Sequence, residues 1–157
     1  MHTPIELPLP GATVHLLPEK AVWWSAARTL FVADVHLGKA ATFRAHGLPV
    51  PEGTTAETLD ALSALLGAYA PARLVFLGDF LHGPASHHPA VLAALRGWRA
   101  RHAGVAMTLV RGNHDSRAGD PPAALAIDLA DEPLDLGPLA ACHHPEAAPR
   151  AVPGASA

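Results

Sequence analysis

The stretch TLFVADVH, residues 29–36, decides the fold predicted for this chain. A mostly apolar run ends abruptly at an acidic residue, which is typical of a buried strand that stops at the rim of a sheet. Two other apolar runs end in the same way: residues 74–77 lead into Gly78-Asp79, and residues 105–110 lead into a polar segment at 111–115. Polar side chains are therefore predicted at the ends of three separate strands.

Amphipathic helices are predicted between these strands. Leucines recur at helical spacing over residues 55–69, and apolar residues do so again over 89–101. Strands that alternate with helices form βαβ units around a parallel sheet, with right-handed crossovers. In such α/β sheets the ligand site lies outside the carboxyl ends of the strands. The fold class predicted is therefore α/β, with the polar segments gathered at one rim.

The remaining elements are shorter. The sequence predicts a hairpin of residues 13–17 and 21–24, and a short helix at 40–46 after the first buried strand. Three short strands are predicted near the end, at about 126–130, 133–136 and 138–142. The tail at 146–157 is rich in Ala, Pro and Gly and is predicted to be disordered.

Composition limits the class of protein. A chain of 157 residues is expected to form one domain, predicted over residues 1–145. The net charge of −3 does not indicate a nucleic-acid binder, but bound divalent cations would add positive charge where phosphate sits. The single Cys142 excludes an internal disulfide framework. With no secretory signal and no apolar stretch of ~18 residues, a cytoplasmic protein without a membrane span is expected.

The strand ends carry residue types that bind metals. Asp34 and His36 are two apart, so in an extended segment both are expected to reach one cation. Carboxylate with imidazole suits Mn, Fe or Zn better than Ca or Mg. Asp79 is expected to bridge two cations ~3.5–4 Å apart, and Asn113 to add a neutral oxygen ligand. Two divalent ions, with Mn favoured and Fe or Zn as alternatives, are therefore predicted.

Histidines near these ligands suggest further roles. His114 is expected to face the substrate as an acid, with Asp115 holding its tautomer and raising its pKa. His143 is predicted as a metal ligand, with His144 as the alternative, and His82 is placed to contact a phosphodiester. With two cations bridged by a carboxylate, a metal-activated hydroxide would attack phosphorus. The reaction class predicted is hydrolysis of a phosphate ester.

In this order, the residues resemble the calcineurin-like metallophosphoesterase superfamily, whose pattern is D-x-H, G-D, G-N-H-[DE], H and G-H-x-H. The segment from His36 to Gly53 and the residues 142–145 (CHHP) resemble more closely the ligase-associated DNA damage response endonucleases. The resemblance implies a βαβ sandwich of two sheets flanked by helices, two Mn-like ions and cleavage of phosphodiesters. It also implies a link to DNA repair.

One element of the pattern is missing. No G-H-x-H follows His144, so each metal site is expected to be short of one ligand and the sandwich to be C-terminally truncated. A truncated copy, a fragment and a protein completed by a partner remain alternatives.

Three hypotheses about function compete. The first is a metal-dependent phosphodiesterase or nuclease. The second is a catalytically impaired homologue that binds metal, nucleic acid or a repair partner such as a ligase or helicase. The third is an α/β domain without a metal. Lys39, Arg44 and Arg111 lie near the motif loops and are predicted to contact substrate phosphates. A homodimer is left open.

Overall fold

A seven-stranded sheet organises the chain, with its strands in sequence order. The computed structural model describes residues 3–47, 54–112, 115 and 118–149. The first four strands form an antiparallel meander, and the fourth to the seventh run parallel. The strands are β1 Ile5–Leu9, β2 Ala12–Leu17, β3 Ala21–Trp24, β4 Thr29–Ala33, β5 Arg73–Leu77, β6 Ala106–Val110 and β7 Ile127–Ala130.

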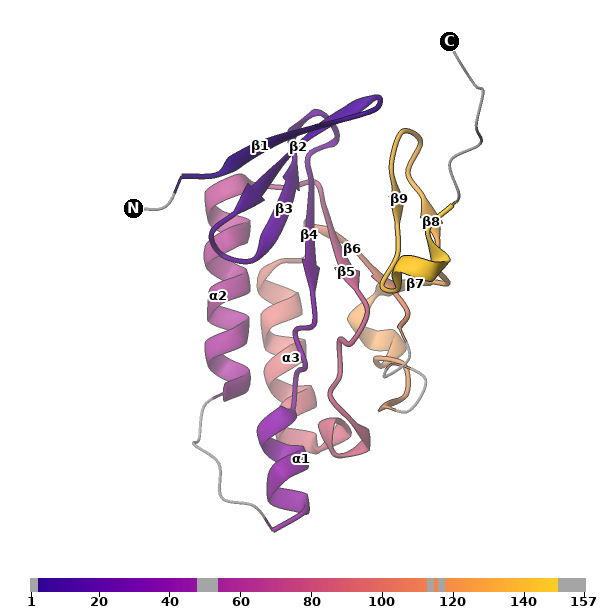
Figure 1. Ribbon diagram of the computed structural model, residues 1–157. Helices are drawn as coiled ribbons and strands as arrows, with labels where there is room; N and C mark the ends of the chain where they lie inside the picture. Colours follow the sequence, from indigo (N-terminus) through magenta and orange to yellow (C-terminus); the bar gives the residue numbers. More distant parts are fainter. Residues whose placement is uncertain (1–2, 48–53, 113–114, 116–117, 150–157) are drawn as a thin grey trace.

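Helices make the crossovers between the parallel strands (Figure 1). α1 Lys39–Ala45 and α2 Thr54–Tyr69 connect β4 to β5, and α3 Pro89–Arg101 connects β5 to β6. Short 3₁₀ turns lie at Ser25–Ala27, Pro84–His87, Ala123–Leu125 and Pro145–Ala147. The predicted α/β class with βαβ units is therefore confirmed.

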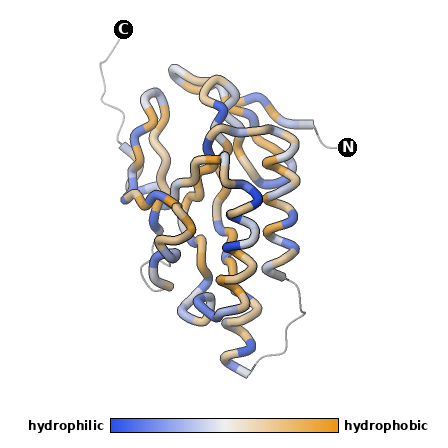
Figure 2. The backbone as a smooth tube through the Cα atoms, turned by 180° about the vertical axis from the view of Figure 1, so that it is seen from behind, coloured by the Kyte–Doolittle hydropathy of each residue, from blue (hydrophilic) through white to orange (hydrophobic). Residues whose placement is uncertain are grey.

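Strand alternation divides the apolar residues between the two faces of the sheet. In β4, Leu30 and Val32 join the core under the helices, whereas Phe31 joins a second core on the opposite face. In β5, Phe76 and Val75 divide in the same way. Figure 2 shows the central strands mainly at the hydrophobic end of the scale, while the helices mix both kinds of residue. Such continuous apolar runs are typical of strands buried on both faces.

A second, two-stranded sheet covers part of the second face. β8 Leu134–Asp135 and β9 Ala140–Ala141 pair antiparallel. Residues of this hairpin, including Ala141 and Leu139, pack against Phe31, Val75 and Val110. In Figure 1 the hairpin lies on the side of the sheet away from α2. The described chain therefore has helices on one face of the large sheet and a small sheet on the other.

One strand was not predicted. Residues 5–9 alternate Ile, Leu and Leu with Glu and Pro, and they form β1 at the edge of the sheet. Proline argues against a central strand because it has no N–H to donate to a neighbouring strand. At an edge it is tolerated, because one side of the strand has no neighbour. The alternation was therefore a usable signal, which Pro8 obscured.

The last described residues are partly ordered. Residues 145–147 form a 3₁₀ turn, although the tail was predicted to be disordered from residue 146, and residues 150–157 lie outside the described part of the chain. The predicted domain boundary at residue 145 stays a prediction. No helix among the described residues is long and apolar enough to cross a bilayer.

Candidate metal centre

The loops after β4 and β5 are joined by backbone hydrogen bonds. The His36 N–H donates to the Asp79 carbonyl at 2.9 Å, and the Leu37 N–H donates to the Phe80 carbonyl at 2.9 Å. The His82 N–H then donates to the Leu37 carbonyl at 2.9 Å. The parallel pairing of β4 and β5 thus continues past the strands. Because of it, residues about 45 positions apart are fixed side by side.

Three of the expected ligands have an unusual backbone. Asp34, His36 and Asp79 have φ angles of 54°, 46° and 51°, in the left-handed region that non-glycine residues rarely adopt. An extended backbone was expected from the sequence between Asp34 and His36, and that expectation is wrong. The segment turns after β4, and this turn brings both side chains to the rim. Strain of this kind often marks a functional site.

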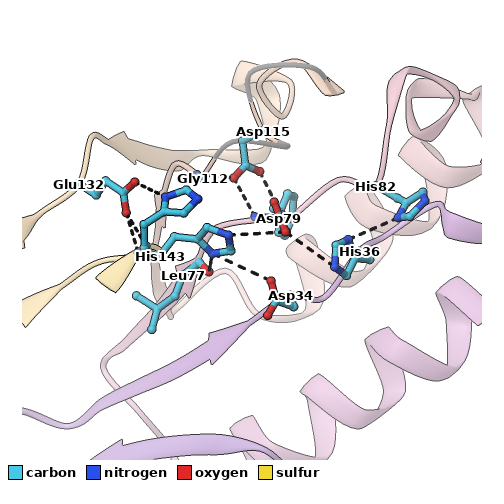
Figure 3. Close-up of polar contacts among 11 residues, drawn as sticks. Asp34, His36, Leu77, Asp79, His82, Gly112, Asp115, Glu132 and His143 are labelled. Carbon is cyan, nitrogen blue, oxygen red and sulfur yellow. Dashed lines mark hydrogen bonds and ion pairs between the residues drawn. The ribbon is translucent and has the colours of Figure 1, made fainter. Parts of the chain in front are cut away.

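Asp34, His36 and Asp79 converge as the sequence predicts. One ligand atom from each lies within 4.8 Å of the others. The Nε2 atom of His36 is 3.8 Å from Oδ2 of Asp79, a side chain that is almost completely buried (Figure 3). These residues come from two loops at the carboxyl end of the sheet, which is the position expected for a ligand site.

His143 lies on the other side of Asp79 (Figure 3). Its Nε2 atom is 3.6 Å from Oδ2 of Asp79, and its Nδ1 atom is 4.0 Å from Oδ1 of Asp34. Nδ1 is also 2.9 Å from the carbonyl oxygen of Leu77. A carbonyl only accepts, so Nδ1 carries the proton and Nε2 presents its lone pair toward Asp79. This geometry supports His143 as a ligand and gives the Asp79 carboxylate an imidazole on each side.

Two glycines make room for the His143 ring. A Cβ atom added to Gly78 would lie 2.3 Å from Nδ1 of His143, and one added to Gly112 would lie 2.6 Å from its Cδ2. Both distances are far below van der Waals contact. The His143 ring therefore packs against the glycines that precede Asp79 and Asn113, and a larger residue at either position would collide with it.

Glu132 holds the loop that carries His143. Its Oε2 atom accepts hydrogen bonds from the backbone N–H groups of His143 and His144, at 2.7 and 2.9 Å. Its Oε1 atom bonds Nδ1 of His144. Burial alone would raise the pKa of the Glu132 carboxyl, but the hydrogen bonds from His144 and His143 outweigh it and the pKa is lowered. The hydrogen bond to Glu132 raises the pKa of His144. His144 is thus engaged away from Asp79.

Asp115 ties the motif loops together. Its Oδ2 atom accepts hydrogen bonds from the N–H groups of Asp79 and Gly112, both at 2.7 Å, and its Oδ1 atom accepts one from Phe80 at 3.0 Å. The side chain is buried. It was predicted to orient His114, which lies outside the described residues together with Asn113. The observed contacts give Asp115 a positioning role for the β5 loop that the sequence did not suggest.

Two predicted substrate contacts have other partners in the structure. Arg111 donates to both carboxylate oxygens of Asp120 at 2.9 Å and to Asp131 at 3.2 Å. These ion pairs connect the end of β6 to the loops that carry Asp120 and Asp131, and a phosphate would have to compete with both carboxylates for Arg111. The role of Arg111 as a substrate contact stays a prediction. His82 has Nδ1 at 3.4 Å from Nδ1 of His36, and it lies edge-on to His36 and Phe43.

The other basic residues lie on α1. Nζ of Lys39 is 5.6 Å from the centre of the Phe43 ring, within the range of a cation–π contact. Lys39 also lines a small cavity beside Asp34 and His36. Arg44 is exposed near the end of the helix and lines a groove between α1 and the start of α3. Lys39 is therefore the cation nearer the candidate metal centre.

The donor set fits a divalent transition metal. Carboxylate and imidazole groups from Asp34, His36 and Asp79 lie within reach of one ion. The second imidazole, on His143, is turned toward the same carboxylate by the carbonyl of Leu77. Metal-binding histidines usually donate their other ring N–H to such an acceptor. The residues are therefore suited to hold a divalent metal ion.

Comparison with known proteins agrees with this geometry. The model of the calcineurin-like phosphoesterase family matches residues 27–147, which include all three motif loops and the segment with His143. This chain belongs to the calcineurin-like phosphoesterase family. The predicted resemblance to the superfamily is therefore confirmed, and so is the α/β fold.

One solved structure gives a closer comparison. The crystal structure of Pseudomonas putida nuclease MPE is similar to this phosphoesterase-family chain, with a TM-score of 0.78 and 43% sequence identity over 87% of the chain. The chain spans 64% of the length of that nuclease's chain. A search of curated proteins finds no match.

Sequence reasoning missed the residues that support the ligands. Glu132 and the carbonyl of Leu77 both hold His143, and neither lies in a recognisable motif. The Glu132-Pro133 dipeptide before a short strand gave no signal of this role. The two glycines were a usable signal, because each precedes a predicted ligand.

We expect Gly112→Ala to weaken binding of Mn²⁺ by about 10-fold or more, because the new methyl group would displace the His143 ring. Isothermal titration calorimetry measures the affinity. Gly67→Ala is the matched control, since a Cβ there meets no atom within 4 Å. It should bind Mn²⁺ as the unmodified protein does. Unchanged affinity in Gly112→Ala would contradict the proposed position of His143.

Glu132→Ala should also reduce Mn²⁺ affinity, by about 10- to 100-fold, because the loop with His143 loses the carboxylate that holds its backbone. Glu19→Ala, in the exposed turn between β2 and β3, is the control and should leave the affinity unchanged. Calorimetry on both variants, with circular dichroism to confirm folding, makes the comparison. Equal affinity in the two variants would show that Glu132 does not position a ligand.

Proposed function

We propose that this protein is a metal-dependent phosphodiesterase that cleaves nucleic acid. The observation that carries the proposal is the Asp79 carboxylate, buried at a strand end with His36 on one side and His143 on the other. Membership of the calcineurin-like phosphoesterase family and the similarity to a nuclease both support it.

The residues have separate roles in this proposal. Asp34, His36, Asp79 and His143 would hold two divalent ions, with Asn113 as a further ligand. When bound, such ions lower the pKa of water and neutralise charge on a phosphoryl group. Mn²⁺ is proposed because mixed carboxylate and imidazole ligands suit it, with Fe and Zn as alternatives.

The chain's own side chains would orient the substrate and move the protons. His114 is proposed to donate a hydrogen bond or a proton to a phosphoryl oxygen or leaving group. If Nε2 of His36 binds a metal, its Nδ1–H can donate to Nδ1 of His82. His82 would then fix the ring of His36 and present its own Nε2 toward the phosphodiester. Asp115 would keep the Asp79 loop in register while the substrate binds.

Nucleic acid is the substrate class that the surroundings of the site favour. Phe43, partly exposed on α1, offers an aromatic ring, and Lys39 lies near that ring. Aromatic rings beside a cation bind unpaired bases and the adjoining phosphate without regard to sequence. Arg44 adds a further cation on the same helix. The overall charge of −3 is compatible with this, since bound metal ions add positive charge at the site itself.

The finer assignments rest on the sequence. The resemblance to ligase-associated endonucleases supports a role in DNA repair, with a ligase or helicase as a partner. A single cysteine in the chain agrees with a reducing, cytoplasmic location.

Hydrolysis of bis-p-nitrophenyl phosphate with saturating Mn²⁺ tests the proposed chemistry. Asp79→Asn and His36→Ala should each reduce kcat by about 100-fold or more, because each weakens the hold on the ions. His15→Ala, on β2 and paired with Glu6, should retain full activity. No cleavage by the unmodified protein would overturn the proposal. Metal binding without any turnover would instead favour the impaired, binding-only homologue.

A second experiment tests the substrate class. Phe43→Ala should raise KM for a single-stranded oligonucleotide by about 5-fold or more, since stacking contributes ~1–3 kcal/mol per base. Lys39→Ala should raise it further in dilute salt, where phosphate contacts are strongest. Both variants should raise KM for the oligonucleotide more than KM for the small diester, and Lys20→Ala in the β2–β3 turn is the charge control. Equal effects on both substrates would contradict the proposed contact between Phe43 and a base.

A further inference from the structure

His87 connects the segment between β5 and α3, residues 78–88, to the loop after β6. It is the last residue of the 3₁₀ turn Pro84–His87. Its Nε2 atom lies 2.6 Å from the carbonyl oxygen of Ala118. A carbonyl only accepts, so Nε2 carries the proton and donates it. Ala118 is buried, where a carbonyl without a partner would be costly, so this hydrogen bond stabilises the loop.

The Ala118 carbonyl lies at the end of a single helical turn. The N–H of Gly119 donates to the carbonyl of Asp115, four residues back, at 3.0 Å. Gly119 has a φ angle of 83°, a conformation that commonly ends a turn of this kind. At the start of the turn, the Asp115 carboxylate accepts hydrogen bonds from the N–H groups of Asp79 and Phe80 (Figure 3). The segment between β5 and α3 therefore holds this turn at both ends.

The 3₁₀ turn that carries His87 is itself firmly placed. The side chain of Ser86 is buried, and its Oγ accepts a hydrogen bond from the N–H of Gly83 at 3.2 Å. A Cβ atom added to Gly38 would lie 2.5 Å from that Oγ, so the 3₁₀ turn packs directly against the β4 loop. The β4 loop also carries two of the candidate metal ligands. The imidazole of His87 therefore extends from a segment fixed beside the metal centre.

We propose that His87 is a positioning residue for the loop that contains Asn113 and His114. Both residues stand between Gly112 and Asp115 in the sequence, so they immediately precede the turn whose far end His87 holds. The proposal rests on the proposed function, in which Asn113 is a metal ligand and His114 donates a hydrogen bond or a proton. Without the bond from His87, the far end of the turn could shift. A displacement of about 1 Å at a catalytic group can cost ~100-fold in rate.

His88, the next residue, has different contacts. Its Nδ1 atom accepts a hydrogen bond from the N–H of Ala90 at 3.2 Å, so it caps the start of α3. Its side chain is exposed. Within the described part of the chain, no hydrogen bond joins it to the loop after β6. The two adjacent histidines therefore provide a matched pair for testing the proposal.

Kinetics and metal binding test the positioning role. His87→Ala should lower kcat for bis-p-nitrophenyl phosphate at saturating Mn²⁺ by about 10-fold or more, and calorimetry should show weaker Mn²⁺ binding. KM for the diester should change little, because His87 acts through the loop. His87→Gln should recover most of the loss, since its side-chain amide also donates a hydrogen bond. His88→Asn keeps an acceptor at the start of α3 and should behave as the unmodified protein does.

Hydrogen–deuterium exchange tests the same contact without metal or turnover. Amides over residues 111–120 should exchange about 5-fold faster in His87→Ala, as expected for the loss of one hydrogen bond, and not in His88→Asn. Unchanged exchange in His87→Ala would overturn the proposal, whether or not the unmodified protein cleaves the diester. Absence of cleavage by the unmodified protein would instead overturn the proposed function.

Three further outcomes would overturn the role of His87. The first is faster exchange in His87→Ala without any loss of kcat or Mn²⁺ affinity, which would show a merely structural contact. The second is a loss in His87→Gln as large as that in His87→Ala. The third is an equal loss in His88→Asn. Circular dichroism of all three variants confirms that each is folded.

Discussion

The buried carboxylate of Asp115 is the contact on which the candidate metal centre depends. It accepts hydrogen bonds from the N–H groups of Asp79, Phe80 and Gly112, and so joins the end of β5 to the loop after β6. A buried carboxylate is costly unless its oxygens are satisfied, and here backbone donors satisfy both. The same contact holds the loop in which Asp79 has its left-handed φ angle of 51°.

The other ligands are positioned by backbone contacts in the same way. Hydrogen bonds between the β4 and β5 loops fix His36 next to Asp79, and the carbonyl of Leu77 orients the ring of His143. The partners in these two contacts are backbone groups at the end of the sheet, and hydrogen bonds of this kind are less sensitive to salt than exposed ion pairs.

The two faces of the large sheet differ in how completely they are covered. Helices α2 and α3 cover one face, where the largest apolar cluster lies. The β8–β9 hairpin covers part of the other, where it also carries the segment leading to His143. The hairpin thus has two functions, since it buries Phe31 and Val75 and brings an imidazole to Asp79. The remainder of that face, along β1 and β2, is exposed.

Much of this could be predicted from local sequence. The buried strands at 29–33 and 74–77 and the helix at 89–101 follow from periodicity, and the convergence of Asp34, His36 and Asp79 follows from the rule that parallel strands end at one rim. Asn113 and His114 lie outside the described residues, so their roles stay predictions. Strand β1 was missed because Pro8 masks an alternating pattern that only an edge position allows.

The sequence by itself determined the α/β class, the family and the residue types able to bind a metal. Only the tertiary structure decided that His143 faces Asp79 while His144 pairs with Glu132. It also decided that Arg111 is held by Asp120 and that Asp115 braces the loops. The physical reason is that secondary structure follows from neighbouring residues, whereas the partner of a side chain depends on which distant backbone groups the fold brings within hydrogen-bonding distance.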